Sequence, residues 1–360
     1  MKKKTVALVF GGKSGEHEVS CKSAYSIAEK IDKTRFELFP IGISKEGEWY
    51  GPIPVSEISN FSPVNFADKR LAFLPQPNSG RIYSWPGFKE LGQIDVFFPI
   101  VHGPFGEDGT IQGLFELADC AYVGAGVSGS AVGMDKILMK RILESSGIPQ
   151  VNYLAYSRKH IEDYRSETID EIEEKLSYPV FVKPANLGSS VGISKAKNTA
   201  DLEQALKIAC EYDRRVIVEE GRNVREIEVS VIGNENPETS EPGEIIPCND
   251  FYDYNAKYIA NESVLDIPAK LPESTRKILN ELAKEAYLAL NCRGFARIDF
   301  FLDKDNNELY VNEINTLPGF TTISMYPKLW EATGKGYAAL LDELIELALE
   351  DYADKKRADS

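Results

Sequence analysis

Histidine is nearly absent from this chain, with three residues in 360. A metal site built from several imidazole ligands is therefore not expected. Cysteine is scarce as well: its five residues are odd in number, scattered and never spaced as C-x-x-C. This pattern argues against a disulfide framework and favours reduced, mostly buried thiols in a cytoplasmic protein.

The sequence also lacks a long apolar run and an excess of basic residues. No apolar run approaches the roughly 20 residues that span a bilayer. The start, MKKKTVALVFGG, resembles a secretory signal, but its apolar part is only TVALVF and two glycines follow, which favours a first β-strand. The 41 Lys and Arg against 56 Asp and Glu give a net charge of -15. That charge argues against a nucleic-acid or membrane-surface binder, although a local basic phosphate pocket is compatible with it.

The first part of the chain predicts an α/β domain. A chain of 360 residues is expected to form two or three domains. Residues 5–10 form a continuous apolar run, as in a parallel strand covered on both faces. A glycine turn, a helix to Lys30 and strands at 35–44 and 94–103 follow, which predicts a parallel sheet. Residues 51–93 are rich in Pro, Ser and Asn, so we interpret them as a surface insertion rather than a core element.

The remaining sequence predicts α+β structure. Residues 151–218 alternate strands with helices, and the last third combines strands with a long helix and a C-terminal helix. The polar end ADKKRADS is expected to fray. We therefore expect a mixed α/β and α+β protein with domains at 1–124, 125–218 and 219–360.

A hairpin in the last third predicts a metal site. In GFARIDFFLDKDNNELYVNEIN, a register centred on Asn306 places Asp299 opposite Glu313 and Arg297 opposite Asn315. Cross-strand Cβ atoms then lie ~5 Å apart, and two such carboxylates repel each other unless a cation lies between them or one is protonated. Carboxylate and amide oxygens suit Mg²⁺ when phosphates complete its shell. The alternative is a solvated hairpin face on which the arginine offsets the acids.

The sequence TLPGF after this hairpin favours a ligand site over a solvated face. Gly319 lets the backbone approach a ligand closely. Arg297 could then hold a phosphoryl group or a developing oxyanion.

A second group of signals indicates a nucleotide. In YPVFVKPANLGSSVGISK, a strand ends at Lys183 and a loop of small residues follows, whose N–H groups can surround phosphate oxygens. The lysine precedes the glycines, so this is not a Walker A motif. Lys136 opens a helix, and Glu219, Glu220 and Glu226 lie at a strand end where adenine and ribose could be bound. The alternatives are a plain turn, a surface lysine and solvated acids.

The segment FYDYNAKY, residues 251–258, fits no hydrophobic period. Asp and Asn make it a poor strand. With the family resemblance given below, we interpret it as a lid whose rings cover a nucleotide and exclude water from a reactive intermediate.

Taken together, these motifs resemble the ATP-grasp ligases, and more narrowly the D-alanine–D-alanine ligase family. The resemblance runs over nearly the whole chain, through GGKSGEHEVS, HGPFGEDGTIQG, GMDK, VKPANLGSSVG, FYDYNAKY, ARIDFF and NEINTLPGFTTISMYP in order. It implies a three-domain ATP-grasp architecture in which the nucleotide is held between the central and C-terminal domains. The insertion at 51–93 is similar to the longer form of the family.

The resemblance implies an activity. One D-alanine carboxylate would attack the γ-phosphate of ATP, and the amine of a second D-alanine would attack the resulting acyl phosphate, giving D-alanyl-D-alanine for peptidoglycan precursors. It further implies two Mg²⁺ ions with Mn²⁺ as a substitute, a monovalent cation activator, and a homodimer that binds neither nucleic acid nor membrane.

The resemblance also implies four groups of site residues. The catalytic group is Glu16, Ser189, Tyr258, Arg297 and the Gly319 N–H. The group around the second D-alanine is His102, Glu107, Lys257, Ser324 and Met325. The ATP-binding group is Lys136, Lys183, Glu219, Glu220, Arg222, Glu226, Phe251 and Tyr252. The metal ligands are Asp299, Glu313 and Asn315.

Three other functions are weighed against this one. A ligase of the same fold could use D-lactate or D-serine as the acceptor, but retention of Lys257 and Tyr258 favours D-alanine. A non-catalytic ATP-binding regulatory protein would not need Arg297 beside the carboxylates. A dinucleotide-binding turn at VFGGKSGEH lacks the G-x-G-x-x-G spacing.

Overall fold

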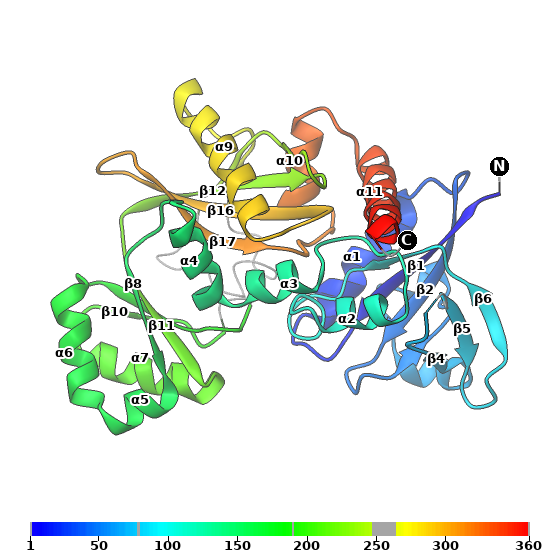
Figure 1. Cartoon of the computed structure of the whole chain (residues 1–360), viewed down its shortest axis with the longest axis horizontal. Coiled ribbons are helices and arrows are strands. Elements are labelled where there is room, and N and C mark those ends of the chain that lie inside the picture. The colour runs from blue at the N-terminus through cyan, green and yellow to red at the C-terminus, as the bar shows by residue number, and fades with distance from the viewer. Residues whose placement is uncertain (1, 78–79, 189–190, 247–263, 359–360) are drawn as a thin grey trace.

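The computed structural model describes residues 2–77, 80–188, 191–246 and 264–358. Within them the chain forms an N-terminal parallel sheet, a central antiparallel sheet and a larger third sheet, with a small sheet on the first (Figure 1). None of the described helices combines the length and apolar character that crossing a membrane requires. The mixed architecture expected from the sequence is thus present.

The N-terminal sheet has the strand order β3-β2-β1-β7. The strands β2, β1 and β7 are parallel, and β3 pairs antiparallel with β2 at one edge. The strands are β1 (Lys4–Gly11), β2 (Phe36–Ile43), β3 (Trp49–Tyr50) and β7 (Val96–Pro99). Val6 to Phe10 are fully buried, because α1 (His17–Lys30) covers one face and α2 (Thr110–Leu117) the other. The parallel strand predicted from the apolar run is confirmed.

The segment 51–93 contributes to the core, contrary to the prediction of a surface insertion. It contains the 3₁₀ turns η1 (Val55–Glu57) and η2 (Pro63–Lys69) and the antiparallel strands β4 (Leu71–Phe73), β5 (Arg81–Ser84) and β6 (Glu90–Gln93). Six of its apolar side chains are buried: Ile53, Ile58, Phe61, Phe66, Leu71 and Ile82. They lie on turns and short strands at irregular spacing, so no hydrophobic period reveals them.

The central sheet has the order β10-β9-β11-β8 and is antiparallel throughout. Its strands are β8 (Tyr153–Ser157), β9 (Val180–Pro184), β10 (Ser194–Ala196) and β11 (Arg215–Glu220). One face packs on α5 (Arg158–Asp163), α6 (Arg165–Lys175) and α7 (Thr199–Tyr212). The other face contacts α4 (Lys136–Ser145) through Ile137, which packs on Ala185 and Ile217.

The third sheet has the order β15-β14-β12-β16-β17, with β13 beside β12. Its strands are β12 (Val224–Ile232), β13 (Glu238–Thr239), β14 (Gly243–Ile246), β15 (Val264–Asp266), β16 (Phe295–Asp303) and β17 (Leu309–Asn315). α9 (Glu273–Ala289) and α4 pack on one face over Ile227, Val229 and Ile298. The nearby helices α3 (Val127–Met134) and α10 (Met325–Ala332) flank this sheet. Because side chains alternate along a strand, Glu226, Glu228, Arg297 and Asp299 share the opposite face.

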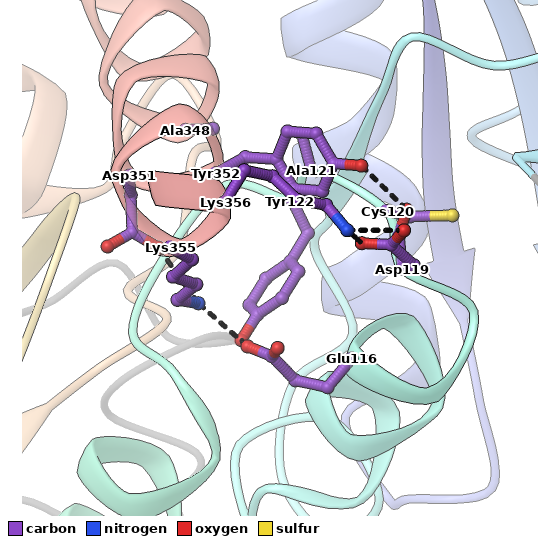
Figure 2. Close-up of a pocket in the computed structure, with 10 residues that line it drawn as sticks. All are labelled: Glu116, Asp119, Cys120, Ala121, Tyr122, Ala348, Asp351, Tyr352, Lys355 and Lys356. Atoms are coloured by element: carbon purple, nitrogen blue, oxygen red, sulfur yellow. Dashed lines mark hydrogen bonds and ion pairs between the residues drawn. The ribbon is translucent and has the colours of Figure 1, made fainter. Parts of the chain in front are cut away.

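The last helix, α11 (Tyr337–Ala358), packs on the first sheet and lies beside α1 (Figure 1). Its Leu340, Leu341, Leu344 and Ile345 are fully buried in the core of β1 and β7. The helix continues into the segment expected to fray, because Lys355 and Lys356 form ion pairs of 2.7 and 2.6 Å. Figure 2 shows the small pocket at this contact, where the partners of the two lysines are Glu116 and Asp119.

The buried insertion can be tested through Phe61. Its ring fills the space beside Gly42 and packs edge-on against Phe10, with 5.6 Å between ring centroids. We expect Phe61→Ala to lower the free energy of unfolding by about 3–5 kcal/mol, measured by urea denaturation. Val64→Ala is the matched control, three residues further on in η2, because Val64 is 83% exposed, and it should change stability by less than about 0.5 kcal/mol. Equal effects of the two variants would contradict this packing.

Candidate active site

The predicted hairpin register is confirmed. Arg297 pairs with Asn315 and Asp299 with Glu313 across β16 and β17. The register then shifts between Asp299 and Phe300, so an irregularity lies directly beside these acids. On the other side of β16, Glu228 of β12 lies opposite Asp299. Three carboxylates therefore form a row across three strands.

Arg297 neutralises much of this row. It donates to Asp299 through Nε to Oδ1 at 2.6 Å and through Nη2 to Oδ2 at 2.7 Å. Its Nε also lies 3.1 Å from Oε2 of Glu228. Burial by itself disfavours the charged guanidinium, but the charges of Asp299 and Glu228 outweigh it and raise the pKa of Arg297 well above its ordinary value. The site thus holds a permanent cation among acids.

The donor chemistry of Asp299, Glu313 and Asn315 fits a hard divalent cation, because all three offer oxygen atoms. The Asn315 Oδ1 also accepts a hydrogen bond of 3.0 Å from the Leu317 N–H, which fixes the orientation of its amide. In the described ranges no group of three His, Cys, Asp or Glu side chains could hold a metal ion. A metal here would therefore depend on the Asn315 amide and on ligands from a substrate.

A buried acid with two lysines lies at the end of the central sheet. Glu219 of β11 pairs with Lys183 of β9 at 2.5 Å and with Lys140 of α4 at 3.1 Å. Burial opposes the Glu219 carboxylate, but the two lysines outweigh it and lower its pKa to about 2. Burial likewise lowers the pKa of Lys140, whose side chain is fully buried.

The positive charge of Lys183 is stabilised by acids of both the central and the third sheet. Burial disfavours its charge, but Glu219, Glu313 and Glu226 together raise its pKa above the ordinary value. Two of these acids, Glu226 and the predicted metal ligand Glu313, are on the third sheet, so the charges of that sheet act on the predicted phosphate lysine. Lys140 was missed by the sequence analysis; its position one helical turn after Lys136 in GMDKILMK was the available signal.

Lys136 opens α4 and reaches the glycine-containing loop. Its Nζ donates to the Leu187 carbonyl at 2.6 Å. The preceding Asp135 caps the helix by accepting from the N–H groups of Ile137 and Leu138, and it also forms an ion pair with Arg215. Lys136 is thus held against this loop rather than on an open surface, and its contact with a phosphate stays a prediction.

The acids expected near adenine and ribose differ in their surroundings. Glu220 accepts from Asn152 Nδ2 at 2.9 Å and lies 3.4 Å from Arg222. Arg222 also donates to Asp303 at 3.3 Å. Both side chains are thus engaged with protein groups, and the Glu220 N–H donates to the Asn152 carbonyl at 2.9 Å. Glu226 is half-buried on the polar face of β12.

Glu16, His102 and Glu107 gather where β1 and β7 end. The His102 Nδ1 lies 3.5 Å from Glu107 Oε1, and both residues are largely buried. Burial lowers the tendency of His102 to ionise, but Glu107 and Glu16 outweigh it and raise its pKa. Burial, helped by the charge of Glu16, raises the pKa of Glu107. Gly103 has φ +74°, and a Cβ there would lie 2.7 Å from Glu16 Oε2, so only glycine fits beside this carboxylate.

His102 connects this cluster to the loop after β17. Its Nδ1 lies 3.0 Å from the Leu317 carbonyl, and its Nε2 lies 3.3 Å from Ser23 Oγ. Ser23 in turn accepts from the Phe320 N–H at 3.2 Å. The first domain therefore fixes the position of the loop that carries Gly319.

The loop itself is compact around Gly319. A Cβ at Gly319 would lie 2.9 Å from Ser324 Oγ, so a larger residue would displace that hydroxyl. Ser324 Oγ also accepts from the Thr321 N–H at 3.0 Å. The Met325 side chain packs in a core with Ile245, so only its main chain is available to a ligand.

Five predicted site residues lie outside the described ranges: Ser189, Phe251, Tyr252, Lys257 and Tyr258. Their roles, and the lid formed by FYDYNAKY, stay predictions.

The Glu219 pair predicts a dependence of stability on acid. The pKa of Glu219 is about 2 in the folded chain and ordinarily 4.5, so its stabilisation is complete above about pH 4.5 and is lost as the pH falls toward 2. Glu219→Gln should therefore be less stable than the parent at neutral pH, and the difference should shrink below about pH 4.5. Urea denaturation from pH 7 to 3 measures it. Glu162→Gln, at an exposed site, should follow the parent throughout; a constant difference for Glu219→Gln would contradict the pairing.

Comparisons with known proteins cover the whole of this arrangement. A family model described as the D-ala D-ala ligase N-terminus matches residues 5–125, and one described as the D-ala D-ala ligase C-terminus matches residues 142–346. A D-alanine–D-alanine ligase of Natranaerobius thermophilus is 50% identical over 358 residues, covering 99% of this chain and 98% of that protein. One of Heliobacterium modesticaldum is 51% identical over the same length and the same shares.

Solved structures are similar over the same extent. The D-alanine-D-alanine ligase from Coxiella burnetii aligns with a TM-score of 0.87 and 35% identity, covering 99% of this chain and 97% of that one. The VanG D-Ala:D-Ser ligase from Enterococcus faecalis aligns with a TM-score of 0.87 and 34% identity, covering 96% and 100%.

Proposed function

The chain belongs to the D-alanine–D-alanine ligase family, and we propose that the polar face shared by β12, β16 and β17 is where it carries out the reaction of that family. It is an ADP-forming ligase with the ATP-grasp fold, and it joins two D-alanines for cell-wall synthesis. The observation that supports the location is the buried Arg297 between carboxylates, facing Lys183 of the central sheet.

The first half of the reaction needs positioning and charge neutralisation. Lys136 and Lys183 would bind the phosphates of ATP, and Glu219 and Glu226 would bind adenine and ribose. Lys183 would exchange its ion pair with Glu219 for a phosphate, while Lys140 stays with Glu219. Asp299, Glu313 and Asn315 would hold Mg²⁺, which neutralises the negative charge of the phosphate oxygens when bound.

The second half needs a fixed amino acid and an oxyanion site. Glu16 would bind the ammonium of the first D-alanine. Its carboxylate lies against Gly103, and its Oε2 is 3.5 Å from the position that a Cβ on Gly188 would occupy, next to the phosphate loop. Arg297 and the Gly319 N–H would stabilise the negative charge that develops on the attacked carbonyl. Loss of one such donor ordinarily raises the barrier by about 3–4 kcal/mol.

The choice of D-alanine as the acceptor is supported by the relatives rather than by the fold. The two solved structures, one of a D-alanine-D-alanine ligase and one of a D-Ala:D-Ser ligase, have the same TM-score to this chain, so the fold does not separate the acceptors. The curated relatives at 50 and 51% identity all carry the D-alanine–D-alanine name, and they support D-alanine.

We propose that the protein is cytoplasmic, which is supported by the thiols of Cys21, Cys210 and Cys292, none of which forms a disulfide within the described residues. Two Mg²⁺ ions, replaceable by Mn²⁺, a monovalent cation activator and a homodimer follow from the family resemblance.

The function is tested by measuring ADP release with D-alanine, L-alanine, D-lactate or D-serine and identifying each product by mass spectrometry between pH 6 and 9. We expect D-alanyl-D-alanine as the main product. A dominant depsipeptide at neutral pH, or preferential formation of D-alanyl-D-serine, would assign the chain to another acceptor. ADP release that does not depend on D-alanine would contradict a ligase.

The metal assignment is tested with Asp299→Asn. Loss of one carboxylate ligand should weaken Mn²⁺ binding in the presence of ADP by roughly tenfold or more, measured by electron paramagnetic resonance of free Mn²⁺. Asp305→Asn, in the exposed turn of the same hairpin, is the control and should bind Mn²⁺ like the parent. Equal binding by both variants would remove Asp299 from the metal site.

A further inference from the structure

Glu228 is a buried acid in the site that the proposed reaction does not use. Its side chain is 7% exposed, and its Oε2 lies 3.1 Å from Arg297 Nε. It occupies the position on β12 directly opposite Asp299. Arg297 therefore has two close carboxylate partners, one on its own strand and one on the neighbouring strand.

Asp299, the partner on the same strand, would have to serve both Arg297 and a metal ion. Both oxygens of Asp299 accept hydrogen bonds from Arg297. A metal ion bound by Asp299 needs at least one of those oxygens and repels the guanidinium. Arg297 must then give up part of this ion pair, yet a buried arginine without a carboxylate is strongly destabilised.

Few groups could take over that role. The residues directly opposite Arg297 are Ser230 and Asn315, and both are neutral. The Ser230 hydroxyl donates to the Tyr326 carbonyl, and the Asn315 oxygen accepts from Leu317. Three carboxylates stabilise the Arg297 charge most strongly: Asp299, Glu228 and Glu313. Two of them belong to the predicted metal set, and Glu228 does not.

We propose that Glu228 is a positioning residue that keeps Arg297 in the site when Asp299 turns to the metal. In this exchange Arg297 moves from a bidentate pair with Asp299 to a pair with Glu228, so that metal binding and the placement of the oxyanion donor are one coupled step. The inference rests on the proposed function, because it needs Asp299 as a metal ligand.

The test is a double-mutant cycle read by Mn²⁺ binding rather than by activity. Mn²⁺ affinity in the presence of ADP is measured by electron paramagnetic resonance for the parent, Glu228→Gln, Arg297→Met and the double variant. Without Glu228, Arg297 stays on Asp299 and competes with the metal, so Glu228→Gln should weaken Mn²⁺ binding. Without Arg297 there is no competitor, and Arg297→Met should bind Mn²⁺ more tightly than the parent.

The coupling between the Glu228 and Arg297 substitutions distinguishes two possible origins of the Glu228 effect. If Glu228 acts through Arg297, its substitution should weaken Mn²⁺ binding at least ~5-fold more in the presence of Arg297 than in its absence, a typical coupling for groups in contact. If Glu228 acts only through its negative charge, its substitution will weaken Mn²⁺ binding by the same factor in the presence and in the absence of Arg297. In that case the proposal is wrong. An unchanged Mn²⁺ affinity in Glu228→Gln would overturn it as well.

Two controls keep the outcomes distinct. Folding of each variant is checked by thermal unfolding, and Arg297→Gln replaces Arg297→Met if that variant does not fold. If Asp299→Asn binds Mn²⁺ like the parent, the metal assignment of the proposed function fails. If Asp299→Asn loses Mn²⁺ but the cycle shows no coupling, only the role of Glu228 fails.

Discussion

The rest of the site depends on one interaction: the buried guanidinium of Arg297 lies among the acids of β12, β16 and β17. Three carboxylates in a row across adjacent strands would repel one another in a region that excludes water. The arginine makes the row stable, and Lys183 extends the neutralisation to the central sheet. Because these cations come from different sheets, the same group of charges connects the central sheet to the third sheet.

The same arrangement explains why the site is assembled from all parts of the chain. The N-terminal sheet contributes Glu16 and His102 at the ends of its parallel strands, and His102 contacts the Leu317 carbonyl in the loop after β17. The central sheet contributes Lys183 and Glu219, and α4 lies between the central and third sheets with Lys140 directed at Glu219. Lys183 lies on the central sheet and the row Glu228, Asp299 and Glu313 on the third sheet, so the arrangement of the sheets determines the site.

Strands and their register could be predicted from the sequence where apolar and polar residues alternate with a clear period of two. The buried strand at residues 5–10 and the hairpin register of Asp299 against Glu313 both follow from alternation, and the structure confirms them. The core role of Phe61 could not be predicted, because it lies between irregular turns and its partners are distant in sequence. Glu228 and Lys140 were missed for another reason. Glu228 alternates with buried Ile227 and Val229 as a solvent-facing acid would, and Lys140 sits in a helix as a surface lysine would. Only tertiary packing makes these two charges buried.

The position of α11 has a consequence for how the chain folds during synthesis. Its leucines cover β1 and β7, although residues 337–358 leave the ribosome only after the other two sheets have been made. The part of the α1-covered face of the first sheet that α11 fills therefore stays open while more than two hundred residues are translated, counted from the end of β7 at Pro99 to the start of α11 at Tyr337. Contacts between such distant segments form slowly, and exposed apolar strands promote aggregation. The nascent chain should thus be a client for chaperones until its final helix docks.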